Sequence, residues 1–151
     1  DIIKDKTGRT PRTDVHTLGA YYRLFLHLSL PTTVKHIIYM DLDVVLLTNV
    51  ERLWDERQDV MFQMGASSCS GFMMFNLHRM ASFWDVVQSG ILEHPDWEWF
   101  SQSADQPLLV NVHRLGHGGV LTDAWDMHLA NGKRTYGDKL HDHGLHAGKS
   151  N

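Results

Sequence analysis

The stretch IIYMDLDVVLL at residues 37–47 decides the fold class of this chain. Two short apolar runs flank a pair of carboxylates, Asp41 and Asp43, and the first run has the composition of a buried strand. Residues two apart in an extended chain point to the same side. Both carboxylates would then face one point, and Leu42 would turn into the core.

This carboxylate pair favours a site for a divalent cation. A buried charge without a partner costs free energy, which a cation or a hydrogen-bond network can offset. Oxygen ligands of this kind suit Mg²⁺ or Mn²⁺, which usually also hold substrate phosphates. The alternative is a strand end at which the Asp side chains cap the following turn, although a cap needs only one of them.

Length and composition indicate one globular domain spanning residues 1–151, because the chain is 42% hydrophobic. With 14 basic and 18 acidic residues and no concentrated basic stretch, it lacks the pattern of a nucleic-acid binder. Cys69 is the only cysteine, which excludes an internal disulfide framework. Because the chain begins with Asp1 and not Met, we interpret it as a fragment or a processed piece. A membrane anchor is expected only in a missing N-terminal part.

Predicted strands alternate with predicted helices, which is typical of an α/β domain. Residues 1–16 form a polar lead-in, and residues 17–30 have helical spacing, with Thr17 as the cap and Pro31 as the stop. Gly90 is expected to end a helix. The other expected elements are strands at 34–40, 44–47, 60–64, 72–77 and near 120–121, and helices at 50–56 with Leu53 and Trp54 facing inward, at 80–89 and at 103–112 with Pro107 in its first turn.

Several short motifs follow one another in a characteristic order. They are YYRL at 21–24, IIYMDLD at 37–43, LW at 53–54, SGFMMFNL at 70–77, ADQPLL at 104–109, WD at 125–126 and HAGK at 146–149. In this order they resemble the core of family 8 glycosyltransferases with the GT-A fold, and the resemblance extends from about residue 18 to residue 149. It is closest to the eukaryotic xylosyltransferase and glucosyltransferase branches.

The resemblance implies a GT-A-like α/β fold, with a mixed sheet flanked by helices, that lacks its first strands in this chain. It implies a retaining glycosyltransferase that moves xylose, glucose or a related sugar from a UDP-sugar to a carbohydrate or glycoprotein acceptor. It also implies Mn²⁺ or Mg²⁺ as the cofactor and a location in the Golgi or ER lumen. Which sugar and which acceptor are used depends on loop contacts that the sequence does not reveal.

The same resemblance implies roles for individual residues. Asp41, Asp43 and His146 would hold the metal ion, and Asp105 and Gln106 would lie at the anomeric carbon of the donor sugar. Because Gln106 is a poor nucleophile, front-face attack by the acceptor hydroxyl is favoured over a covalent intermediate. The donor-binding residues would be Arg23, Asp41, Leu42, Asp43, Ser70, Gly71, Asp105, Gln106, Gly148 and Lys149.

Several of these roles have structural alternatives. Arg23 could be an ordinary ion-pair partner on its helix, and Asp105 could cap the helix that it precedes. Gly71 could serve only a close approach of the backbone. His143 competes with His146 as the third metal ligand, because a spacing of six residues between this histidine and the lysine is common in the family.

Two other functions remain open. An apolar strand ending in Asp41 and Asp43 also resembles the first motif of haloacid-dehalogenase-type phosphatases, in which Asp41 would attack phosphorus, Asp43 would be the general acid, and Asp138 and Asp142 would help to hold Mg²⁺. The polar stretch at 131–135 argues against this reading, because that late motif normally follows a buried strand. The third reading is a degenerate, non-catalytic glycosyltransferase domain. It is supported by Cys69 and Asp126, which stand where the family has asparagine.

Overall fold

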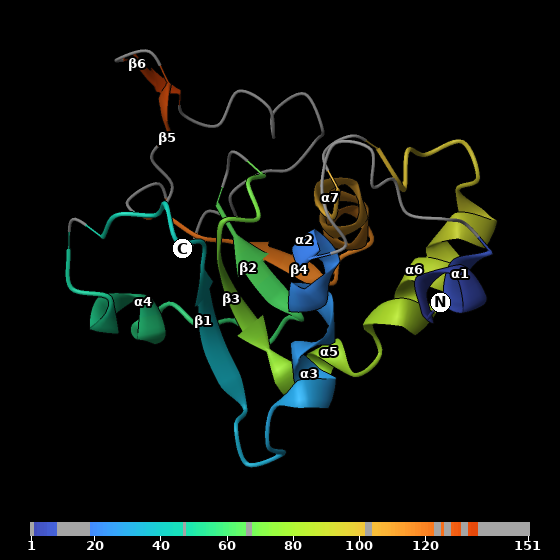
Figure 1. Cartoon of the computed structure of the whole chain (residues 1–151), viewed down its shortest axis with the longest axis horizontal. Coiled ribbons are helices and arrows are strands. Elements are labelled where there is room, and N and C mark those ends of the chain that lie inside the picture. The colour runs from blue at the N-terminus through green and yellow to red at the C-terminus, as the bar shows by residue number, and fades with distance from the viewer. Residues whose placement is uncertain are drawn as a thin grey trace.

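The computed structural model shows a four-stranded mixed sheet flanked by helices (Figure 1). It describes residues 2–8, 19–46, 48–65, 68–101, 104–122, 125, 128–130 and 133–135. This architecture agrees with the predicted α/β class. The predicted residues Thr17, Asp126, Asp138, Asp142, His143, His146, Gly148 and Lys149 lie outside the described residues.

The sheet combines antiparallel and parallel neighbours in the order β1-β3-β2-β4. Strand β3 lies antiparallel to both β1 and β2, whereas β2 and β4 run parallel. Because β1 lies at one end of this order, it pairs with a single strand, with Ile38 opposite Met74. The strands are β1 (His36–Met40), β2 (Phe62–Met64), β3 (Phe72–Asn76) and β4 (Gly118–Val120).

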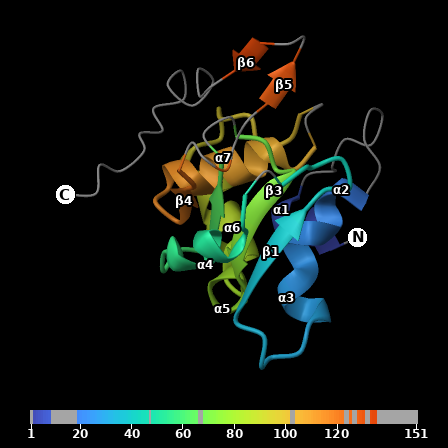
Figure 2. The same ribbon diagram turned by 90° about the vertical axis from the view of Figure 1, so that its left-hand side faces the viewer.

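Helices cover both faces of the sheet, and Figure 2 shows α2 and α3 on one side of β1 and α4 on the other. The larger core lies on the side of the sheet that α2 and α3 cover. It contains the buried Phe75, and Tyr39 packs against it. The smaller core lies under α4 and contains Leu53 and Met74. The helical segments are α1 (Ile2–Thr7), α2 (Gly19–Tyr22), the 3-10 helix η1 (Arg23–Phe25), α3 (Leu26–Ser29), α4 (Glu51–Asp55), α5 (Leu77–Met80), α6 (Phe83–Glu93) and α7 (Gln106–Arg114).

Successive side chains of β1 and β3 alternate between the two cores. Side chains of successive strand residues point to opposite faces, so Ile37 and Tyr39 pack on the larger core while Ile38 packs on the smaller one. Strand β3 is buried on both faces because helices cover each side, which explains its continuous apolar sequence FMMF at 72–75.

The helical spacing at 17–30 correctly predicts a helical segment before β1. The structure divides it into α2, the tighter η1 and α3, and the segment ends at Leu30, which has extended backbone angles directly before Pro31. The lead-in at 1–16 was wrongly expected to be irregular throughout, because residues 2–7 form α1. The buried Ile3 of α1 joins the larger core, and tertiary contacts of this kind can stabilise a helix too short to form alone.

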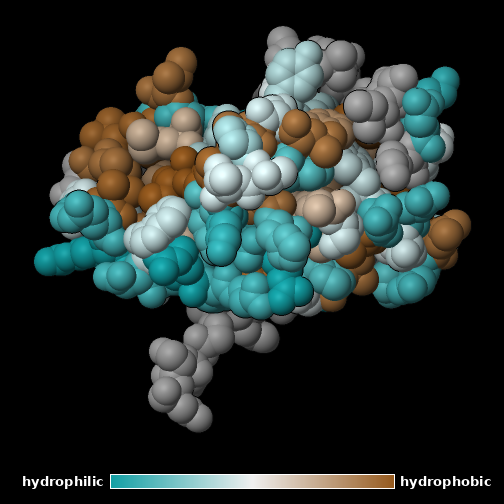
Figure 3. All heavy atoms as spheres, turned by 90° about the horizontal axis from the view of Figure 1, so that it is seen from below, coloured by the Kyte–Doolittle hydropathy of each residue, from teal (hydrophilic) through white to brown (hydrophobic). Residues whose placement is uncertain are grey.

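The strand predicted at 44–47 is absent from its described residues 44–46. The chain turns at residues 42–43, and the amide of Val44 donates a hydrogen bond to the carbonyl oxygen of Asp41 at 3.1 Å. Leu42 is fully exposed instead of entering the core, and Val45 is mostly exposed. Figure 3 shows apolar side chains at its left end, the side on which Figure 1 places β1 and α4.

Two predictions about single side chains also fail. Trp54 does not face inward, since it is 39% exposed and its ring lies beneath the guanidinium of Arg57, whereas Leu53 is buried as expected. Gly90 does not end a helix but lies inside α6, where a Cβ atom would come within 2.4 Å of the Trp99 ring. Gly90 therefore serves close packing.

The end of the described chain contains a second, two-stranded antiparallel sheet that was not predicted. It pairs β5 (His128–Ala130) with β6 (Lys133–Thr135). The sequence contained a usable signal, since Asn-Gly at 131–132 is the most typical dipeptide of a two-residue hairpin loop. The last strand predicted from the sequence is the one near 120–121. That strand is present as β4.

Candidate functional site

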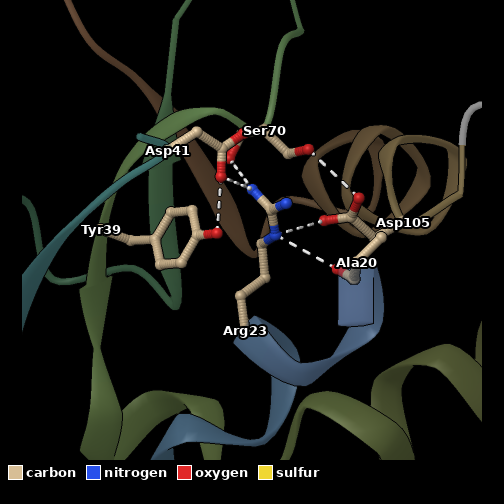
Figure 4. A network of polar contacts seen from close by, with 6 residues as sticks. All are labelled: Ala20, Arg23, Tyr39, Asp41, Ser70 and Asp105. Carbon is tan, nitrogen blue, oxygen red and sulfur yellow. Dashed lines mark hydrogen bonds and ion pairs between the residues drawn. The ribbon is translucent and has the colours of Figure 1, made fainter. Parts of the chain in front are cut away.

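A buried arginine lies at the centre of the candidate site (Figure 4). Arg23 is the first residue of η1, and its side chain is only 9% exposed. Its Nε donates a hydrogen bond to the carbonyl oxygen of Ala20 at 3.2 Å, and its Nη1 donates to the carbonyl oxygen of Ser70. These bonds attach the guanidinium to its own helical segment and to the loop before β3.

Two carboxylates flank this guanidinium. Nη1 of Arg23 lies 3.4 Å from Oδ1 of Asp41, and Nε lies 3.4 Å from Oδ2 of Asp105. Asp41 directly follows β1, whereas Asp105 directly precedes α7, so packing of these elements is needed to bring the two acids together. One positive charge therefore lies between two carboxylates, and a further cation beside them would be electrostatically favourable.

Tyr39 connects Asp41 to Arg23. Its hydroxyl donates a hydrogen bond to Oδ1 of Asp41 at 2.6 Å, and the guanidinium carbon of Arg23 lies 4.4 Å from the centre of its ring. Burial and the bond to Asp41 raise the pKa of Tyr39 to about 12, so the hydroxyl keeps its proton at neutral pH. The residues two apart that meet here are thus Tyr39 and Asp41, not Asp41 and Asp43.

Asp105 is 2% exposed and is the most deeply buried acid of this site. Desolvation raises its pKa from an ordinary 3.8 to about 6, although the charge of Arg23 and a hydrogen bond from Ser70 oppose the increase. The Ser70 hydroxyl donates to Oδ1 at 3.1 Å. Oδ2 accepts no hydrogen bond from the described residues, since the Arg23 contact is an ion pair without hydrogen-bond geometry.

The alternative role of Asp105 as a helix cap is not observed. Asp105 occupies the position before α7, and its carbonyl oxygen accepts a bond from the amide of Leu109 at 3.1 Å, but its side chain makes no capping hydrogen bond. Its carboxylate turns toward Arg23 and Ser70. The expected Pro107 lies in the first turn of α7.

Strained backbone occurs in both of the segments that carry Ser70 and Asp105. Ser68 has φ 61° and Ala104 has φ 54°, in the left-handed region that side-chain-bearing residues rarely adopt. Ser68 lies two residues before Ser70, and Ala104 lies directly before Asp105. Strain of this kind is often found at functional sites, where surrounding contacts maintain it.

Gly71 lies close to Asp41. A Cβ atom at this position would lie 3.0 Å from Oδ2 of Asp41 and 3.5 Å from Sγ of Cys69. The amide of Asp41 also donates to the carbonyl oxygen of Gly71 at 2.7 Å, so the two backbones approach closely. Gly71 therefore serves a close approach of the backbone, as one interpretation predicted.

The structure brings together five of the predicted site residues and separates others. The residues that converge are Arg23, Asp41, Ser70, Gly71 and Asp105. Leu42 and Asp43 are exposed in the turn, whereas Asp41 is half-buried. Gln106 begins α7 and is half-buried, outside the contacts drawn in Figure 4. Tyr39 was missed, although its place two residues before Asp41 in a strand was a usable signal.

The residues of this site fit a divalent cation in part. Among the described residues, no group of three His, Cys, Asp or Glu side chains is arranged to hold a metal ion. Asp41 and Asp43 are nevertheless the first and third residues of one tight turn. Their carboxylate oxygens are the ligand type that Mg²⁺ and Mn²⁺ prefer. A third protein ligand would have to come from another part of the chain.

Comparisons of the chain with known protein families, with curated proteins and with solved structures found no match. No helix in the described ranges is both long and apolar enough to span a membrane.

Proposed function

We propose that this chain is a retaining glycosyltransferase domain of the GT-A type that uses a UDP-sugar as its donor. The observation that carries the proposal is the convergence of Arg23, Asp41, Ser70 and Asp105 in one polar network. These residues come from separate motifs of the family pattern and belong to segments far apart in the sequence. A mixed sheet between helices is an architecture that the proposal requires.

The electrostatics of the network suit the departure of a nucleoside diphosphate. Breaking the sugar–phosphate bond places negative charge on the leaving group, so the site must stabilise that charge. Asp41 and Asp43 would hold a divalent cation, and the cation would supply the positive charge next to the diphosphate. Arg23 would add a fixed positive charge nearby, because its guanidinium is already held by backbone oxygens and by Asp105.

Asp105 would contact the donor sugar. Its Oδ2 accepts no hydrogen bond from the described residues and is buried, so a sugar hydroxyl would satisfy it once the segment before α7 moves aside. Gln106, directly after Asp105, would lie near the anomeric carbon. An amide is a weak nucleophile, which favours attack by the acceptor hydroxyl on the face from which UDP leaves, with retention of configuration.

Calorimetric titration of UDP into the purified chain tests this proposal, first with Mn²⁺ and then with EDTA. We expect binding that EDTA abolishes, followed by transfer when UDP-xylose, UDP-glucose and related donors are screened with glycan acceptors. Binding without transfer from any donor would favour the degenerate domain. Hydrolysis of a generic phosphomonoester without UDP binding would favour the phosphatase.

A matched pair of variants makes the metal assignment specific. Asp43→Asn should remove Mn²⁺-dependent UDP binding while leaving the urea midpoint of unfolding unchanged, because Asp43 is exposed and its charge has no structural role. Asp96→Asn makes the same chemical change at another exposed position and should change neither property. Unchanged UDP affinity in Asp43→Asn would contradict the assignment.

The third metal ligand is proposed to be His146. His146→Ala should weaken Mn²⁺ binding more than His143→Ala, because a lost imidazole ligand cannot be replaced by a neighbouring side chain without rearrangement. The opposite order of the two affinities would transfer the role to His143. Lys149→Ala should weaken UDP binding without changing Mn²⁺ affinity, since its charge would contact the diphosphate and not the ion.

A further inference from the structure

Tyr39 contacts two charged groups of the site, Asp41 and Arg23. Its hydroxyl bonds to Oδ1 of Asp41, and its ring lies against the guanidinium of Arg23. Figure 4 shows the aromatic ring on one side of Arg23 and Asp105 on the other. A single side chain of β1 therefore contacts both the carboxylate of Asp41 and the guanidinium of Arg23.

The hydroxyl determines which carboxylate oxygen of Asp41 remains available. Both contacts of this carboxylate, from Tyr39 at 2.6 Å and from Arg23 at 3.4 Å, are made to Oδ1. Oδ2 accepts neither of these contacts, and it lies close to Gly71, where a Cβ atom would come within 3.0 Å of it. Without the hydroxyl, the carboxylate could rotate and offer both oxygens to Arg23, because an arginine readily binds a carboxylate through two nitrogens.

The ring in turn limits the movement of Arg23. The face of an aromatic ring attracts a guanidinium, and the 4.4 Å separation lies within the range of that interaction. The Tyr39 ring is itself packed edge-on against Phe75, with 6.4 Å between the ring centres and 81° between the planes. Phe75 is fully buried in β3, so this support is rigid.

We infer that Tyr39 is a positioning residue, which holds Asp41 by its hydroxyl and Arg23 by its ring so that Oδ2 of Asp41 remains available to a divalent cation. The inference rests on the proposed function for the identity of the ligand. The contacts of Tyr39 with Asp41 and Arg23 do not depend on that function. Partners that orient a metal ligand typically change metal affinity by 10- to 100-fold when they are removed.

The first experiment measures Mn²⁺ affinity by electron paramagnetic resonance, which reports free Mn²⁺ without any turnover. Tyr39→Phe removes only the hydroxyl and should weaken Mn²⁺ binding about tenfold. Tyr39→Leu also removes the aromatic face and should weaken binding further. Tyr22→Phe, the same chemical change at a side chain that is 68% exposed, should leave the affinity at the wild-type value.

The second experiment needs no metal. Tyr39→Phe should lower the urea midpoint of unfolding in the wild-type background but not in an Asp41→Ala background, where the hydroxyl has lost its acceptor. An equal decrease in both backgrounds would mean that the hydroxyl does not act through Asp41. That result would overturn the inference.

The two experiments separate failure of the inference from failure of the proposed function. Wild-type Mn²⁺ binding that Tyr39→Phe leaves unchanged would overturn the role of Tyr39 and leave the glycosyltransferase proposal standing. A wild-type chain that binds no Mn²⁺ would refute the proposed function and, with it, presentation of Oδ2 to a cation. Loss of Mn²⁺ affinity together with a background-dependent urea midpoint would support the inference.

Discussion

Nε of Arg23 lies 3.4 Å from Oδ2 of Asp105, and the exposed fractions of the two side chains are only 9% and 3%. Water therefore screens this ion pair little, unlike the pair of Arg79 and Asp59, which is largely exposed. Losing one partner of a buried pair leaves an uncompensated charge in the interior. Because it is buried, the Arg23–Asp105 ion pair should hold η1 to the start of α7 more strongly than an exposed ion pair would.

Removing the Asp105 carboxylate should destabilise the fold. Asp105→Ala leaves Arg23 paired with Asp41 among the described acids and leaves the Ser70 hydroxyl without its acceptor. We expect a loss of about 1–3 kcal/mol in the free energy of unfolding, measured by urea denaturation. The exposed Asp96→Ala is the control and should change this free energy by less than about 0.5 kcal/mol. A similar small change in Asp105→Ala would show that the pair has no structural importance.

The stability of the protein should depend on pH through Asp105. Burial raises the pKa of this acid from 3.8 to about 6, so folding favours its protonated form. The stabilisation is fully present below pH 3.8 and is lost as the pH rises through 6. Relative to Asp105→Asn, which cannot ionise, the wild type should lose on the order of 2 kcal/mol between these limits. Urea denaturation of both proteins from pH 4 to pH 7 measures the difference, and a constant difference would contradict the prediction.

Adding a Cβ atom at position 71, beside Asp41, should impair ligand binding more than folding. Gly71→Ala places a Cβ atom 3.0 Å from Oδ2 of Asp41, closer than an ordinary van der Waals contact. We expect weaker Mn²⁺-dependent UDP binding in calorimetry and a change of about 1 kcal/mol or less in the free energy of unfolding. Wild-type UDP affinity in this variant would show that the ligand does not use this side of the carboxylate.

Gly90 should be irreplaceable within α6. Alanine normally stabilises a helix by about 1 kcal/mol relative to glycine. At position 90, however, its Cβ atom would collide with the Trp99 ring at 2.4 Å and with Leu115 at 2.8 Å. Gly90→Ala should therefore lower the free energy of unfolding by about 1–3 kcal/mol. The adjacent Ser89→Ala, at an exposed position of the same helix, should be neutral or stabilising. A stabilising Gly90→Ala would contradict the packing argument.

Local sequence pattern predicted the elements that surround the site but not all of their ends. The strand before Asp41, the helical segment before Pro31 and the helix after Asp105 were all expected from apolar spacing and proline position, and each is present. The course of the chain after Asp41 was predicted wrongly. Apolar residues at 44–46 suggested a strand, but the structure pairs β1 only as far as Met40 and then turns. Strand pairing depends on a partner elsewhere in the chain, which no local pattern contains.

The site was likewise predicted in part. Motif order identified Arg23, Asp41, Ser70, Gly71 and Asp105 as candidates, and these residues converge. The same reasoning paired Asp41 with Asp43, because it assumed an extended chain across both. Tyr39 was overlooked because a tyrosine within an apolar strand is usually a core residue, and its hydroxyl contact becomes visible only when Asp41 and Arg23 are in place.

The sequence by itself determined the α/β class, the order of the main elements and the chemical types available to the site, because periodicity, proline and side-chain chemistry are local properties. Only the tertiary structure decided that Arg23 lies between Asp41 and Asp105, that Tyr39 contacts both Arg23 and Asp41, and that Asp105 is buried deeply enough to raise its pKa to about 6. Ion pairs, burial and desolvation depend on how η1 and α7 pack beside the sheet, and that packing joins residues that are far apart along the chain.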